Sequence, residues 1–146
     1  MVRGGVAKGV PAPWASLVFD SEGIWAVARN DSEDARAVLD ASRLAGVPVV
    51  IPSVVLAETL QGNERDARVN QVLKSIEVIP IGTESARLAA MLKHRSNMTG
   101  VEVTIDALVV AVSALLGGGA ILTSDPDDIN RLASAVPEIR IRAITP

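Results

Sequence analysis

Carboxylates placed beside apolar segments are the residues of this chain best suited to chemistry. Asp20 ends an apolar run, Glu58 stands inside one, Asp106 lies near the start of one and Asp125 follows one. Carboxylate oxygens are preferred ligands of hard cations such as Mg²⁺ or Mn²⁺, and a small carboxylate site leaves positions open for water and phosphate oxygens. The four acids therefore predict metal-assisted hydrolysis of a phosphodiester. If they lie close together, their repulsion should raise the pKa of at least one of them when no metal is bound.

The segment from Thr104 to Asp128, TIDALVVAVSALLGGGAILTSDPDD, brings two of these acids into one unit. It reads as an apolar helix, a turn at the three glycines and a short buried strand. A right-handed connection in a parallel sheet would bring Asp106 and Asp125 to the C-terminal edge of that sheet, where open α/β proteins bind their ligands. The glycines follow a helix and lack the lysine of a phosphate-binding loop, so they predict a turn only.

Strand-like runs alternate with helical patterns along the rest of the chain, which predicts an α/β domain with a parallel sheet covered on both faces. Glu58 falls in one of the helices, where a buried carboxylate would need a partner. The strands are expected at 15–19, 47–51, 78–81 and about 120, with an alternating edge strand at 138–144. The helices are expected from 21, from 31 or 32, from 53, over 63–76, from 83 toward 98 and from 104.

Length and composition define a single domain. The 146 residues suffice for one core, and we expect residues 1–14, rich in glycine and proline, to form a flexible leader before a domain at 15–146. The absence of cysteine excludes thiolate chemistry, and no apolar run is long enough to cross a membrane, so a cytoplasmic protein is expected. A net charge of -3 gives no overall basic field for nucleic acid, so a nucleic-acid role needs local evidence. Only three aromatic residues argue against folds that bind single strands by base stacking.

A family resemblance rests on the order and spacing of four segments. VFD at the end of the first strand, IPSVVLAETLQG, the Thr104 to Asp128 segment and the final short strand together resemble the PIN-domain ribonucleases, particularly the VapC toxins of bacterial toxin-antitoxin pairs. The resemblance covers about residues 16–144. It implies a three-layer α/β/α PIN-like domain with a mainly parallel central sheet of four to five strands.

The resemblance also implies an activity and partners. The chain would be a Mg²⁺- or Mn²⁺-dependent endoribonuclease with an RNA substrate, a cognate antitoxin and a homodimeric state. Its acidic quartet would fall on Asp20, Glu58, Asp106 and Asp125. Asp127 would assist as a further metal ligand beside Asp20, Asp106 and Asp125, and the site would be supported by hydrogen bonds from Thr123 and Ser124.

Structural explanations compete for each acid. Asp125, followed by Pro126, also has the pattern of a helix N-cap, Asp106 that of a first-turn acid behind a Thr104 cap, and Asp20 that of a turn. Glu58 would be a solvated surface acid only if its helix turned that position outward from its apolar neighbours. The alternative function is therefore a catalytically silent PIN-like module that binds RNA or protein. A receiver-type signalling domain would need paired acids after the first strand and a late lysine, and neither is present.

Overall fold

A five-stranded, fully parallel sheet forms the centre of the molecule, and the computed structural model describes residues 14–146. The strand order is β3-β2-β1-β4-β5, with registers such as Val18 opposite Val50 and Ile121. This order confirms the predicted α/β fold and places the C-terminal strand at an edge. The strands are β1 (Leu17–Phe19), β2 (Val49–Pro52), β3 (Glu77–Ile79), β4 (Gly119–Leu122) and β5 (Ile141–Ile144).

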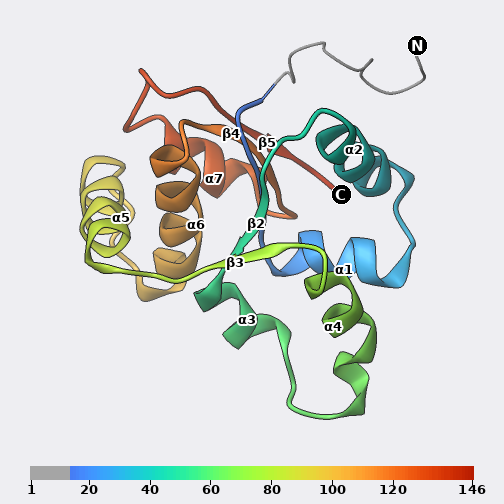
Figure 1. Cartoon of the computed structure of the whole chain (residues 1–146). Helices are drawn as coiled ribbons and strands as arrows, with labels where there is room; N and C mark the ends of the chain where they lie inside the picture. Colours follow the sequence, from blue (N-terminus) through green and yellow to red (C-terminus); the bar gives the residue numbers. More distant parts are fainter. Residues whose placement is uncertain (1–13) are drawn as a thin grey trace.

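Helices cover both faces of the sheet, as the three-layer prediction requires (Figure 1). One layer contains α1 (Ser21–Arg29), α2 (Glu33–Leu44) and α4 (Ala67–Leu73), and the opposite layer contains α5 (Thr83–Arg95), α6 (Thr104–Leu115) and α7 (Pro126–Ala133). The short α3 (Ser53–Thr59) follows β2, and 3-10 turns occupy Glu64–Asp66 and Val101–Val103. No helix within residues 14–146 has both the length and the apolarity needed to cross a membrane.

Helix α6 lies deepest in the molecule. Every residue from Ala107 to Ala114 is buried, and the helix packs against the sheet on one side and between α5 and α7 on the others. A helix enclosed in this way must be apolar all round, which explains why its sequence lacks a polar stripe. Burial of α6 fixes the position of its first turn, and Asp106 lies in that turn.

The glycine turn after α6 brings β4 directly against β1. Gly117, Gly118 and Gly119 all have positive φ angles, and an added Cβ at Gly119 would lie 2.2 Å from the backbone oxygen of Ser16. Only glycine tolerates that conformation and that approach. The predicted turn is thus confirmed, with the difference that Gly119 already belongs to the strand.

Local polar contacts explain where the elements differ from prediction. The helix expected over 63–76 is split, because the buried Asp66 carboxylate accepts hydrogen bonds from the amides of Gln61 (2.8 Å) and Gly62 (2.7 Å) and closes a turn. Helix α5 stops at Arg95 rather than near residue 98, since Asn97 has a φ of 58°. Residues 1–13 of the predicted leader lie outside the described part of the chain. Trp14, the last residue of that predicted segment, donates a hydrogen bond from its indole to Ser42 Oγ at 2.9 Å.

Candidate metal centre

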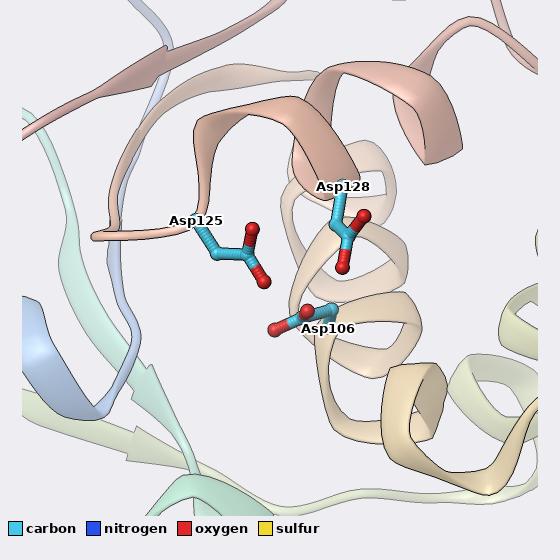
Figure 2. Close-up of side chains that lie close together, drawn as sticks. All are labelled: Asp106, Asp125 and Asp128. Carbon is cyan, nitrogen blue, oxygen red and sulfur yellow. The ribbon is translucent and has the colours of Figure 1, made fainter.

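Three aspartates from two helices meet beside the C-terminal end of β4. Asp106 lies in the first turn of α6, Asp125 precedes the first turn of α7, and Asp128 lies within that turn. One carboxylate oxygen from each of the three lies within 4.8 Å of the others, and their side chains point toward a common space (Figure 2). The predicted convergence of Asp106 and Asp125 is therefore present in the structure.

The electrostatics of this group centre on Asp106. Partial burial is the largest cause that raises the pKa of Asp106, from 3.8 to about 7. Repulsion by Asp125, Asp20, Asp128 and Glu58 follows, in that order. This is the abnormal titration expected of clustered carboxylates without a cation. Burial and the nearby Asp125 also raise the pKa of Asp128.

Asp20 caps helix α1 and also lies close enough to the three-aspartate group to act on Asp106. It is 7% exposed at the end of β1, and its Oδ1 accepts a hydrogen bond from the Gly23 amide at 2.9 Å, which caps α1. Burial raises the pKa of Asp20, although hydrogen bonds from Thr123 and the Gly23 amide act in the opposite direction. The turn interpretation thus accounts for one of its oxygens, and its charge still reaches Asp106.

Asp125 stands at the N-cap position of α7 without acting as a cap. Its side chain makes no capping hydrogen bond. Its backbone amide instead donates to Thr123 Oγ1 at 3.0 Å, and Thr123 is fully buried. Thr123 therefore holds the loop that presents the Asp125 carboxylate to the group, while Ser124 is exposed. Asp106 likewise makes no capping bond, and Thr104 accepts a hydrogen bond from Lys93 Nζ at 2.8 Å rather than capping α6.

Three predicted acids, Asp20, Glu58 and Asp127, lie outside the three-aspartate group, and one member of the group, Asp128, was not predicted. Glu58 is exposed near the end of α3, so the argument that it is buried and needs a partner is wrong, although its charge still acts on Asp106. Asp127 is exposed on α7, and Asp128 takes the place expected for it. The signal was the spacing of three between Asp125 and Asp128, which brings N-cap and third helical positions together.

The ligand set fits a hard divalent cation. All donors of the group are carboxylate oxygens, which Mg²⁺ and Mn²⁺ prefer. Repulsion by neighbouring carboxylates adds to the effect of burial in raising the pKa of Asp106, and a bound cation would relieve that repulsion. The arrangement can therefore hold a cation at the edge of the sheet and leave part of its coordination shell to other oxygens.

Comparisons with known proteins agree with this fold. No curated protein sequence is significantly similar to this chain. The solved structure of VapBC2 from Rickettsia felis bound to a DNA fragment from their promoter is similar, with 13% identity, 88% of this chain and 98% of that chain covered, and a TM-score of 0.65. The structure of FitAB bound to the IR36 DNA fragment is similar with 16% identity, 88% and 94% coverage and a TM-score of 0.62. The family model of the PIN domain matches residues 18–135, and the chain belongs to the PIN domain family.

Proposed function

We propose that this chain is a metal-dependent endoribonuclease, the VapC-type toxin of a toxin-antitoxin pair. The observation that carries the proposal is the group of Asp106, Asp125 and Asp128, in which burial and then the neighbouring carboxylates raise the pKa of Asp106 to about 7. Membership of the PIN domain family supports nucleic acid as the substrate class. Acids at helix N-termini are favourable individually, but their convergence on one space suits a functional site.

The proposed ligands of Mg²⁺ or Mn²⁺ are Asp20, Asp106 and Asp125, and Asp128 joins them on geometric grounds. A bound cation would lower the pKa of a water molecule and polarise a phosphate oxygen. Asp20 and Asp125 are held in place by backbone contacts, through the Gly23 amide and through Thr123 respectively. Glu58 is proposed to act on the substrate side of the site, since it is exposed and its charge acts on Asp106.

Partners are proposed by analogy with the similar structures. Those structures are of VapBC2 and FitAB on DNA fragments. We infer that this chain pairs with an antitoxin protein and forms a homodimer. Five large apolar side chains, each more than a third exposed, would supply part of such contacts: Leu44, Val78, Val101, Leu115 and Leu116.

Cleavage of RNA by the purified chain tests the proposal. We expect Mg²⁺- or Mn²⁺-dependent cleavage of labelled RNA, which EDTA abolishes. Asp106→Asn and Asp125→Asn should each lower the rate by roughly 100-fold or more, the scale of loss when a group that stabilises the transition state is removed. Asp34→Asn, an exposed acid of α2, is the matched control and should cut like the wild type.

Metal binding separates this proposal from the silent-module alternative. Mn²⁺ titration followed by electron paramagnetic resonance should show binding that Asp106→Asn weakens. Binding with no cleavage of any RNA would favour the silent module. Unaltered cleavage by the Asp106→Asn variant would show that the site assignment is wrong.

A further inference from the structure

A cavity lined by arginines lies between α1, α2 and α4, apart from the metal centre. Its volume is about 630 Å³, within the range of ligand sites in proteins. None of the acids of the metal centre lines it. Its lining includes four arginines and no carboxylate: Arg29, Arg36, Arg43 and Arg68. A chain of net charge -3 therefore concentrates positive charge at one hollow.

Three of the four arginines have no ion pair within residues 14–146, and of these Arg43 and Arg68 do not line the acidic hollow beside Arg36. Arg29 lies 3.9 Å from the Asp31 carboxylate and stacks over Trp25, and Arg36 also borders a neighbouring acidic hollow. Within residues 14–146, no carboxylate lies within ion-pairing distance of Arg43 or Arg68. The C-terminal end of α1 also faces the cavity, but its dipole amounts to only about half a negative charge.

The side chain of Arg43 extends across the cavity and is held there by a hydrogen bond. Its guanidinium donates to the hydroxyl of Ser75, which follows α4, so the side chain spans from α2 to the far wall. The Ser75 hydroxyl is neutral, so it occupies one of the five N–H donors of the guanidinium and leaves the positive charge unpaired. The remaining donors match the oxygens of a phosphate, which arginine can bind through two parallel hydrogen bonds.

The floor of the cavity is apolar. Val27 is 4% exposed and Leu39 is 1% exposed, and both contribute to the lining together with Val72. An apolar floor beneath a cationic rim suits a ligand with a flat, weakly polar part and an anionic part. A nucleotide unit has that chemistry, since its base offers a π-face and its phosphate the charge.

Helix α1 links this cavity to the metal centre. Asp20 caps its first turn beside Asp106, and Arg29 ends it at the cavity. Nine residues of helix separate the two, a rise of about 13 Å. A nucleic acid strand that follows α1 would therefore reach both places.

We propose that the cavity lined by Arg43 and Arg68 binds a backbone phosphate of the RNA strand that is cut at the metal centre. The proposal rests on the proposed ribonuclease function for the identity of the strand. The phosphate chemistry rests on the arginines alone. The cavity would hold the strand in register at a distance from the reacting phosphodiester, as phosphate contacts generally do.

Binding without cleavage tests this site. The full chain carrying Asp106→Asn is titrated in EDTA with a short fluorescent oligoribonucleotide at several salt concentrations. Arg43→Gln and Arg68→Gln should each weaken binding roughly fivefold and reduce the slope of log affinity against log salt by about 0.7 per lost contact. Arg87→Gln removes the same charge from exposed α5 on the opposite face and should change neither quantity.

Two further probes identify the ligand chemistry. Inorganic phosphate should shift the side-chain NMR resonances of Arg43 and Arg68 in the otherwise unmodified chain, and those of Arg87 should stay unchanged. A glutamate-rich peptide that shifts them when neither phosphate nor the oligoribonucleotide does would overturn the proposal in favour of a protein partner. Equal RNA binding by the Arg43→Gln, Arg68→Gln and Arg87→Gln variants would also overturn it.

The outcomes separate this site from the proposed function. If the wild type cuts no RNA and the arginine variants still lose phosphate and RNA binding, the ribonuclease proposal fails and the phosphate site stands. If the wild type cuts RNA and the arginine variants bind RNA normally, the ribonuclease proposal stands and the phosphate site fails.

Discussion

Asp106 combines partial burial with surrounding negative charge more fully than any other described carboxylate. Its helix cannot move away from its neighbours, because the following residues of α6 are buried on all sides. Its pKa of about 7 is therefore imposed by the fold rather than by its own sequence context. A side chain held in this state responds strongly to both protons and cations.

The stability of the metal-free protein should fall as pH rises from about 4 to 7. The unfolded Asp106 loses its proton near pH 3.8, whereas the folded one keeps it to about 7. Below pH 3.8 Asp106 is protonated in both the folded and the unfolded state, and its contribution to the free energy of unfolding is fully present. That contribution is lost as the pH rises through the pKa of the folded state. Urea unfolding in EDTA measures this, and Asp106→Asn should flatten the slope in that window. An identical slope in the two proteins would contradict it. Mn²⁺ should restore stability at pH 7.5 or so in the wild type only.

Asp128 and Asp127 make a matched pair for testing the ligand set. They are adjacent acids in the first turn of α7, yet only Asp128 belongs to the three-aspartate group. Asp128→Asn should weaken Mn²⁺ binding at least roughly tenfold, a loss typical even of residues that only support metal ligands. Asp127→Asn, with the same change in charge, should weaken it far less. Isothermal titration calorimetry measures both, and the opposite ranking would return Asp127 to the site as first predicted.

At the level of elements, the metal centre depends on how α6, the glycine turn and β4 are joined. The turn sets β4 beside β1, so that Asp20 and Thr123 follow neighbouring strands. Thr123 then accepts a hydrogen bond from the Asp125 amide and fixes the entry into α7. A short connection of small residues thus controls the approach of three carboxylate-bearing elements.

Gly119→Ala should destabilise the fold severely. Its φ is 135°, and the new Cβ would lie 2.2 Å from the Ser16 oxygen and 2.7 Å from the Ser16 nitrogen. Strain and overpacking together should cost roughly 3–5 kcal/mol in free energy of unfolding. Gly46→Ala is the control, since Gly46 also has a positive φ of 73° but no atom within 4 Å. It should cost only about 1–2 kcal/mol by urea unfolding. Equal losses at the two positions would show that close approach contributes nothing.

At the level of the whole molecule, a parallel sheet brings the ends of β1 and β4 to one edge and leaves the arginine-lined cavity among the helices of one layer. The metal ligands and the arginines of the cavity are therefore separated, and these arginines do not neutralise the acids directly. The charges of both signs remain available to external ligands.

Expression in a bacterial host tests the toxin proposal on the intact chain. Induced wild-type protein should arrest growth, and the product of a neighbouring small open reading frame should restore it. Asp106→Asn should accumulate to the same level and leave growth unaffected, because it removes the proposed metal ligand and keeps the fold. Growth curves with immunoblots for protein level measure this. Arrest by the Asp106→Asn variant would point to a mechanism other than metal-dependent cleavage.

The sequence by itself determined the element order, the parallel sheet and the pairing of Asp106 with Asp125, because hydrophobic periodicity and the glycine turn are local signals. The sequence also predicted that repulsion among these acids would raise the pKa of at least one of them. The spacing of three between Asp125 and Asp128 also held the signal for Asp128. Only the tertiary structure decided the exposure of Glu58 and the gathering of arginines from α2 and α4 into one cavity. These depend on which way a helix faces once it is packed against distant elements, and no local pattern fixes that rotation.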